Sequence, residues 1–242
     1  MKYSAVIAAQ NEELMLPDCL SSVTGADEVI VIDDESTDST AQIAEATGAT
    51  VYKRKLDGFA TQKNFGIDKA RNNWVLIIDA DERLSPELAS AIAQLVPAAG
   101  VSAYSMPFRN HLGHRWLHHG GLYPDRHVRL FDRRKARYGL REIHEELEVE
   151  GKIIELDYDV LHLTYATWRE YLAKVKKYSR AQALADIKLG RIIKPRSRYR
   201  AMIGELYFRF IQLAGYRDGV AGLISAVLLA WYQYRYWTVV KT

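Results

Sequence analysis

The sequence predicts an α/β fold built on a mostly parallel, Rossmann-like sheet flanked by helices, and three observations lead to it. Apolar runs of strand length alternate with helical patterns through residues 1–100. Two of these runs end abruptly in carboxylates, and open α/β sheets bind their ligands just beyond the carboxyl ends of the strands. The chain has 242 residues, enough for one sizeable domain and an appendage.

Strands and helices are expected to alternate strictly along residues 1–100. Each expected strand is a short run of apolar, often β-branched residues, and the helices begin at capping residues or at a proline. The expected strands cover residues 3–8, 28–32, 50–52 and 74–78, and the expected helices cover residues 11–25, 38–48, 59–70 and a segment that begins at Ser85.

Residues 101–162 differ in character from the segment before them. Strands are expected at 101–109, 127–131 and 158–163, and a basic loop rich in histidine and glycine lies between the first two. All seven histidines fall between His111 and His162, but their spacings match no compact zinc motif. The loop histidines are therefore expected to be ordinary members of a basic loop.

The C-terminal part is expected to be a helical appendage that is both basic and apolar. A helix is expected over residues 164–190, followed by a basic linker at 191–200 and two apolar segments at 203–214 and 220–240. The charge-free run from 219 to 234 has sixteen residues, fewer than the ~20 that span a bilayer. Its many Trp and Tyr residues favour a membrane–water interface over helix packing on the catalytic domain or in a dimer.

The charge distribution supports this division of the chain. Residues 1–162 carry 18 Lys and Arg against 26 Asp and Glu, whereas residues 163–242 carry 15 against 4. We therefore expect an acidic catalytic domain at 1–165 and a basic extension at 166–242. The single cysteine, Cys19, excludes an internal disulfide, and the N-terminus does not read as a signal peptide, so a cytoplasmic location is expected.

The acidic stretch after the fourth expected strand is a candidate metal site. Asp79 and Asp81 lie two residues apart and so share one face of an extended strand, whereas Glu82 is expected to point away. Ligand sets made only of oxygen favour Mg²⁺ or Mn²⁺. The alternative is a solvated acidic turn. The chain contains neither GxGxxG nor GxxxxGK[ST], so nucleotide phosphates are expected to be held through a metal instead of a glycine-rich loop.

Six segments, in this order along the chain, resemble the family 2 glycosyltransferases of the GT-A fold. They resemble most of all the branch of lipopolysaccharide-core heptose β-1,4-glucosyltransferases. The segments are VIAAQNEE (6–13), DEVIVIDDESTDST (27–40), GFATQKNFGIDKA (58–70), WVLIIDADERL (74–84), GGLYPDRHVRLF (120–131) and IHEEL (143–147).

This resemblance implies a nucleotide-sugar-binding half at 1–100 and an acceptor half at 101–165. It also implies roles for individual residues in binding a nucleotide sugar and a metal. Asp81 would bind the metal directly, Asp79 would act on the ribose or through water, and His162 would supply a nitrogen ligand. The neutral alternative for His162 is a half-buried strand histidine. The residues implied to bind the nucleotide sugar are Ala9, Asn11, Glu12, Asp34, Lys63, Asp79, Ala80, Asp81 and Arg126.

The resemblance also implies an inverting transfer, in which one carboxylate takes the proton from the acceptor hydroxyl. Glu145 is the first candidate for this base and Asp125 the second. The stretch around Glu145 is crowded with carboxylates, so a surface role is its alternative. Arg126 and Arg129 are candidates to hold phosphates of the donor or the acceptor, since Arg suits bidentate contacts.

The expected function is therefore a metal-dependent transfer from a nucleotide sugar, most naturally a UDP-sugar, to a hydroxyl of a membrane-associated anionic glycolipid such as the lipopolysaccharide inner core. The alternatives are an enzyme that uses polyprenyl phosphate as acceptor and a non-catalytic protein that binds a nucleotide or a membrane. The expected partners include the inner face of the cell membrane and, through the C-terminal helices, a second copy of the chain, but no nucleic acid.

Overall fold

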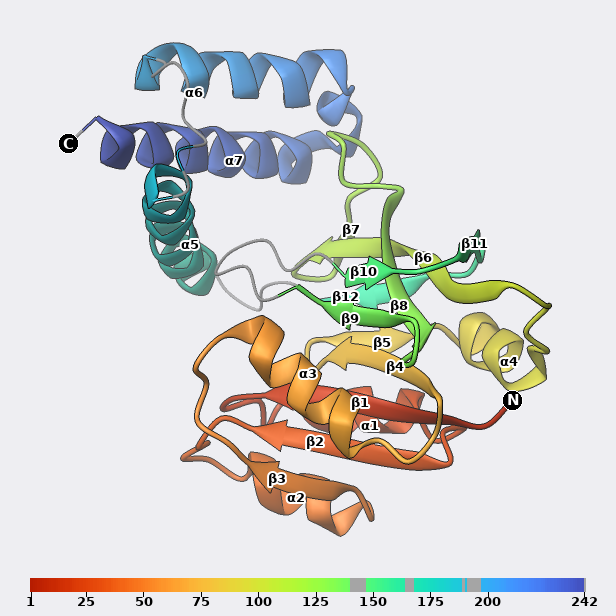
Figure 1. Ribbon diagram of the computed structural model, residues 1–242. Helices are drawn as coiled ribbons and strands as arrows, with labels where there is room; N and C mark the ends of the chain where they lie inside the picture. The colour runs from red at the N-terminus through yellow and green to blue at the C-terminus, as the bar shows by residue number, and fades with distance from the viewer. Residues whose placement is uncertain (140–146, 164–167, 189, 191–196, 242) are drawn as a thin grey trace. The chain divides into compact units, whose positions relative to one another are not determined.

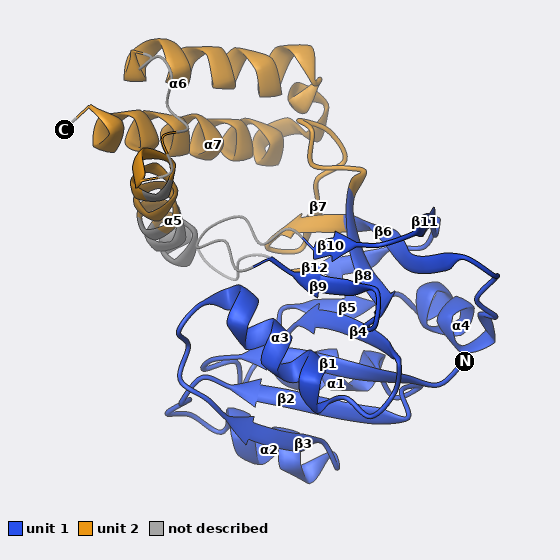
Figure 2. Cartoon of the chain, viewed as in Figure 1, with its two compact units in different colours: residues 1–108, 126–162 blue, residues 109–125, 163–242 orange. Residues whose placement is uncertain are grey.

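The computed structural model describes residues 1–139, 147–163, 168–188, 190 and 197–241, whose helices and strands are shown in Figure 1. The chain divides into two compact units, coloured separately in Figure 2. Unit 1 contains residues 1–108 and 126–162, and unit 2 contains residues 109–125 and 163–242. The loop at 109–125 thus belongs to the same unit as the C-terminal helices, whereas the expected division placed a single boundary after residue 165.

Unit 1 is built on a large mixed sheet with the strand order β3-β2-β1-β4-β8-β6-β12-β5. The pairs β1–β2, β1–β4 and β2–β3 are parallel, whereas β8 runs antiparallel to β4 and β12 antiparallel to β5. The strands of this path are β1 (Tyr3–Ala9), β2 (Glu28–Asp33), β3 (Thr50–Lys53), β4 (Trp74–Asp79), β5 (Glu82–Leu84), β6 (Val101–Leu112), β8 (Asp125–Asp132) and β12 (Val160–His162).

Short additional strands extend this framework. Strand β11 (Lys152–Glu155) pairs with β6, and β7 (Arg115–Trp116) pairs with the far end of β6. Strands β9 (Ala136–Tyr138) and β10 (Leu147–Val149) form a separate two-stranded ribbon. These strands and β5 have only two to four residues, too few for a readable hydrophobic period, and the sequence analysis did not predict them.

Both faces of the central strands are buried, because side chains alternate between two apolar layers. Along β1, Ala5 and Ile7 pack in one layer with α1 (Leu16–Ser22) and α4 (Pro86–Gln94). Ala44 of α2 (Thr40–Ala46) belongs to the same layer. Val6 faces the other layer, together with Ile67 of α3 (Phe59–Lys69). Continuous apolar runs therefore form the strands at the centre of the sheet, as the sequence predicted.

Helix α3 sits tightly on the sheet at Gly66. A Cβ atom at this position would lie 2.3 Å from Val6 Cγ1 and 3.3 Å from Ile32 Cγ1. Both neighbours are buried strand residues without room to move. The glycine therefore sets the spacing between α3 and the strands that lead to the site.

Unit 2 combines the 109–125 loop with a group of helices: α5 (Trp168–Lys188), α6 (Arg198–Tyr207), the π-helical turn η1 (Phe208–Gln212), the 3₁₀ turn η2 (Gly215–Asp218) and α7 (Gly219–Val240). Helix α7 packs against both α5 and α6, with Leu228 against Val175 of α5. At Gly222, a Cβ atom would lie 1.9 Å from the Gly215 carbonyl oxygen, so the start of α7 fits closely under η2.

The loop is fastened to this helical bend by polar contacts. The backbone N–H and ring Nδ1 of His119 contact the Asp218 carboxylate at 2.8 and 2.9 Å. The Gly120 N–H donates to the Leu213 carbonyl at 2.8 Å, and Arg209 Nη1 donates to the Gly120 carbonyl at 2.9 Å. The Gly-Gly segment therefore brings the loop backbone close to the turn that precedes α7.

Among the described helices, none alone has the length and apolar character needed to cross a membrane. Residues 198–212 and 215–240 reach that length and composition only together, and the chain bends by 72° between them.

Replacing Gly66 by Ala is expected to lower the free energy of unfolding by about 1–3 kcal/mol, since overpacking outweighs the better helix propensity of Ala. The matched control is Gly204→Ala in α6, where a Cβ atom meets nothing within 4 Å. That change is expected to stabilise by up to about 1 kcal/mol. Urea unfolding followed by circular dichroism measures both, and equal effects of the two substitutions would refute the tight fit of α3.

Candidate active site

The candidate site lies at the carboxyl edge of the parallel strands, on either side of β1. Ala8 pairs with Ile32 of β2 on one side and with Asp79 of β4 on the other. The residues that end β2 and β4 are therefore two strand spacings apart, about 10 Å. This is the crevice position at which open α/β sheets bind nucleotides.

Asp34 stands at the β2 side of this edge in a fixed conformation. Its N–H donates to the Ala9 carbonyl at 2.9 Å, and its Oδ1 accepts the Leu56 N–H at 2.7 Å. Asp34 and Ala9 are both buried, at 8% and 6% exposure. One carboxylate oxygen thus anchors the chain after β3, which holds the acid at the end of the strand.

The segment after β1 is tied to the segment after β2. Asn11 adopts a left-handed conformation with φ of 56°, and its Oδ1 accepts the Thr37 N–H at 2.8 Å. The Glu12 N–H donates to Thr40 Oγ1 at 2.8 Å. These contacts give Asn11 and Glu12 a role in shaping the edge of the site.

Asp79 lies between two cations. Lys63 Nζ of α3 is 3.6 Å from its Oδ1, and Arg129 Nη2 of β8 is 3.4 Å from its Oδ2. Burial opposes ionisation of this carboxyl, but Lys63, Arg129 and His162 outweigh it and hold the pKa of Asp79 at about 2. Asp79 is therefore an anion at neutral pH whose charge is already compensated from within the protein.

Glu82 does not point away from the site, contrary to the sequence expectation. It is 1% exposed, its Oε2 accepts the Asp79 N–H at 3.1 Å, and its Oε1 accepts a hydrogen bond from Arg129. The expectation continued the alternation of β4 through Glu82, whereas β4 ends at Asp79 and β5 begins after a turn. Burial raises the pKa of Glu82 despite the neighbouring Arg129 guanidinium.

Asp81 and His162 meet across the β5–β12 pair. His162 is the partner of Glu82 in the antiparallel register, and its Nε2 lies 3.7 Å from Asp81 Oδ2. Burial lowers the pKa of His162, but the Asp81 carboxylate outweighs it and raises that pKa overall. One ligand atom from each of Asp81, Glu82 and His162 falls within 4.8 Å of the others. The two carboxylates offer the oxygen ligands that suit Mg²⁺ or Mn²⁺, and the imidazole adds a nitrogen of the kind that transition-metal ions accept.

The other residues that the sequence predicted for the site lie in different parts of the fold. Ala80 is buried in the turn between β4 and β5. Arg126 contacts the Leu156 carbonyl, Asp157 at 2.6 Å and Glu155 at 3.4 Å, so its contacts are with acids of unit 1 outside the metal-ligand group. Asp125 belongs to unit 2, where its Oδ2 lies 3.4 Å from Asn110 Nδ2. Glu145 lies outside the described residues.

Arg129 pairs with two carboxylates of the candidate site, whereas the sequence predicted only that it could hold phosphates. It contacts Asp79 and Glu82 and stacks on the Phe108 ring at 5.0 Å, whereas Arg126, three residues earlier, turns to other acids. Within the described residues its buried Nε has no hydrogen-bond partner. The separation of Arg126 from Arg129 by three residues places them on opposite faces of β8, a signal available in the sequence.

Comparisons with known proteins agree with this geometry. The model of the family described as "Glycosyl transferase family 2" matches residues 4–147. The chain is 28% identical over 95% of its length to an uncharacterized glycosyltransferase of Rickettsia conorii, 86% of which is covered. It is 27% identical over 96% of its length to the lipopolysaccharide core biosynthesis glycosyltransferase LpsC of Rhizobium meliloti, 88% of which is covered.

A solved structure shares the fold. The S. aureus protein TarS, crystallised as residues 1–349 in complex with UDP-GlcNAc, aligns with a TM-score of 0.51 at 16% identity. The alignment covers 100% of this chain and 91% of that chain. The architecture is thus the mixed α/β GT-A fold with a C-terminal helical part that the sequence predicted.

Replacing Arg129 by Met is expected to lower the free energy of unfolding by about 3–5 kcal/mol, because it leaves the buried Glu82 carboxylate without its cation. The double variant Arg129→Met with Glu82→Gln is expected to recover most of that loss. The matched control is Arg137→Met, which removes the exposed pair with Asp68 and is expected to cost less than about 1 kcal/mol. Similar losses for Arg129→Met and Arg137→Met in urea unfolding would contradict the buried pair.

Proposed function

The chain belongs to glycosyl transferase family 2 and is a glycosyltransferase, and we propose that it moves a sugar from a nucleoside diphosphate sugar, a UDP-sugar by preference, to a hydroxyl of a membrane-associated glycolipid. The observation that carries the proposal is the group of Asp81, Glu82 and His162 at the carboxyl edge of the sheet, with Asp34 across β1. The spacing of about 10 Å suits a nucleoside diphosphate that lies along this edge.

The donor is proposed to lie with its nucleoside at Asp34 and its diphosphate at the acidic turn. Asp34 Oδ1 accepts the Leu56 N–H, and we propose that the other carboxylate oxygen, Oδ2, accepts a hydrogen bond from the base or the ribose. Lys63 and Arg129 supply positive charge beside Asp79, where a diphosphate needs it. Ala9 ends β1 between these two positions, and its carbonyl accepts the Asp34 N–H that fixes the nucleoside end of the site.

Asp81 and His162 fit a divalent cation, Mn²⁺ or Mg²⁺, through one oxygen and one nitrogen. Glu82 belongs to the same group, but both of its oxygens already accept hydrogen bonds, so we assign it the orientation of the Asp79 backbone and of Arg129. When bound, such a cation neutralises the charge that develops on the departing diphosphate. Asp79, held ionised by Lys63 and Arg129, is proposed to act on the ribose.

The acceptor hydroxyl must lose a proton as it attacks the anomeric carbon, and a single carboxylate suffices in an inverting transfer. Glu145 is the proposed base and Asp125 the second candidate. The substitutions Glu145→Gln and Asp125→Asn distinguish the two candidates. Replacing the residue that acts as base is expected to lower kcat and to leave UDP binding unchanged.

The proposed acceptor is an anionic glycolipid such as the lipopolysaccharide inner core, reached from the cytoplasmic face of the membrane by a peripherally bound enzyme. Two observations support this proposal. The similar protein LpsC is named for lipopolysaccharide core biosynthesis. Residues 163–242 carry 15 Lys and Arg against 4 Asp and Glu, an excess of charge that attracts anionic lipid surfaces.

UDP with Mn²⁺ is expected to raise the melting temperature of the protein by about 5–10 °C near saturation, since a ligand that binds only the folded state stabilises it. Asp81→Asn is expected to reduce this shift to the value measured with UDP and EDTA. The control Asp18→Asn changes an exposed carboxylate and should keep the full shift. A full shift in EDTA, or in Asp81→Asn, would rule out the proposed metal role.

A further inference from the structure

Helix α6 carries an exposed apolar stripe along one side. Tyr199, Ile203, Tyr207 and Ile211 follow one another at four-residue spacing and are 54%, 63%, 54% and 48% exposed. At 3.6 residues per turn this spacing keeps them on one side of α6 and η1. We call these four residues the α6 stripe.

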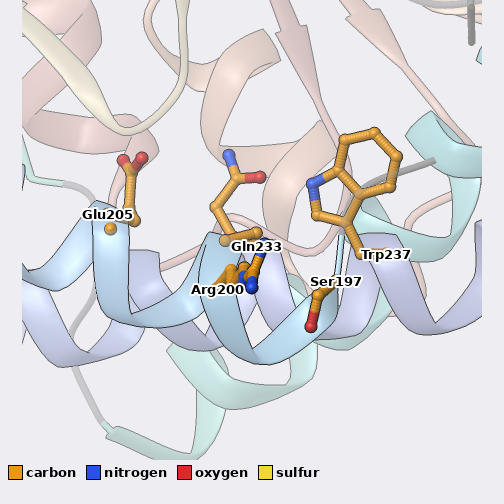
Figure 3. Close-up of a pocket in the computed structure, with 7 residues that line it drawn as sticks. Ser197, Arg200, Glu205, Gln233 and Trp237 are labelled. Atoms are coloured by element: carbon orange, nitrogen blue, oxygen red, sulfur yellow. The ribbon is translucent and has the colours of Figure 1, made fainter. Parts of the chain in front are cut away.

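A polar groove of about 520 Å³ lies next to the stripe, between α6 and α7. In Figure 3 the side chains of Glu205, Gln233 and Trp237 extend to the same side of the two helices. Arg200 and Gly204 each follow a stripe residue by one position, so the groove borders the stripe along the helix. The lining residues are Ser197, Arg200, Ala201, Gly204, Glu205, Gln233 and Trp237.

The charge balance of this region is positive. Residues 197–241 contain six Lys and Arg against two Asp and Glu. Both acids are paired within unit 2: Glu205 with Arg209 and Asp218 with His119. The remaining cations include the exposed Arg200 in the groove, so the groove presents a net positive charge beside an apolar surface.

Aromatic rings hold another cation at the same end of α6. The Arg198 guanidinium lies over the rings of Tyr199 and Tyr234, at 5.2 and 5.3 Å from their centroids. Such stacking keeps a guanidinium at the boundary between apolar and polar surroundings. Tyr and Trp side chains prefer the same boundary at the surface of a bilayer.

We infer that the α6 stripe and the α6–α7 groove form a binding surface for an anionic lipid bilayer. The stripe enters the boundary of headgroups and acyl chains, and the groove receives a phosphate-bearing headgroup. Arg200 supplies the charge for the phosphate, while Ser197, Gln233 and the Trp237 indole supply polar contacts of the kind a headgroup needs. This inference rests on the proposed function for its biological setting, but it uses residues other than those of the donor site.

A second copy of the chain is the competing occupant of the stripe. The bilayer is favoured because Arg198 and Arg200 border the stripe, and Glu205, the one acid among the residues that line the groove, is paired with Arg209. Two copies would bring those arginines together, and like charges oppose association. An anionic bilayer meets the same arginines with opposite charge.

The test is co-sedimentation of the purified protein with vesicles of phosphatidylglycerol and phosphatidylcholine, against vesicles of phosphatidylcholine alone. The wild type is expected to bind the anionic vesicles at least tenfold more tightly. Ile203→Glu is expected to abolish most of this binding, whereas Val96→Glu, which makes the same change at an exposed residue of unit 1, should leave it unchanged. Arg200→Gln is expected to weaken it about fivefold.

Three outcomes overturn the inference: equal binding of both kinds of vesicle, equal binding by Ile203→Glu and Val96→Glu, or a dimer in sedimentation that Ile203→Glu converts to monomers without any vesicle binding. Competition with glycerol phosphate distinguishes a site for the soluble phosphate from one that needs the bilayer. The thermal shift with UDP and Mn²⁺ is recorded for each variant. Vesicle binding without that shift refutes the proposed function alone, and the shift without vesicle binding refutes this inference alone.

Discussion

The site depends on one buried cation, the Arg129 guanidinium. It extends from β8 and contacts Glu82 of β5 and Asp79 of β4, so it ties β8 to two consecutive strands that lie 47 and 50 residues earlier in the chain. Glu82 in turn accepts the Asp79 N–H, which fixes the start of the acidic turn. Buried carboxylates repel each other unless a cation is close. Arg129 and Lys63 therefore let Asp79 and Glu82 stay near Asp81.

This arrangement separates carboxylates that look alike in the sequence. Asp79 is compensated by Lys63 and Arg129, Glu82 is enclosed by hydrogen bonds, and Asp81 faces His162. We propose that a divalent cation binds at Asp81 and His162, whose ligand atoms lie within 4.8 Å of each other and of Glu82. Unit 2 differs in charge, since its helices carry the basic excess and its loop is fastened to them through Asp218.

Much of this could be predicted from the sequence, for reasons visible in particular residues. The central strands are buried on both faces and so appear as continuous apolar runs, and their parallel order brings Asp34 and Asp79 to one edge. The orientation of Glu82 could not be predicted, because it depends on a turn before the three-residue β5. The contact of His119 with Asp218 joins residues 99 positions apart, and no local pattern records such a pairing.

We propose that the edge formed by Asp34, Asp81 and His162 binds a nucleoside diphosphate together with a divalent cation. A crystal structure with UDP and Mn²⁺ would locate both ligands, because manganese can be identified by its anomalous scattering. We expect one manganese peak in contact with Asp81 and His162, with the UDP diphosphate beside it and the uridine at Asp34. Manganese or UDP bound away from this edge would refute the proposed site.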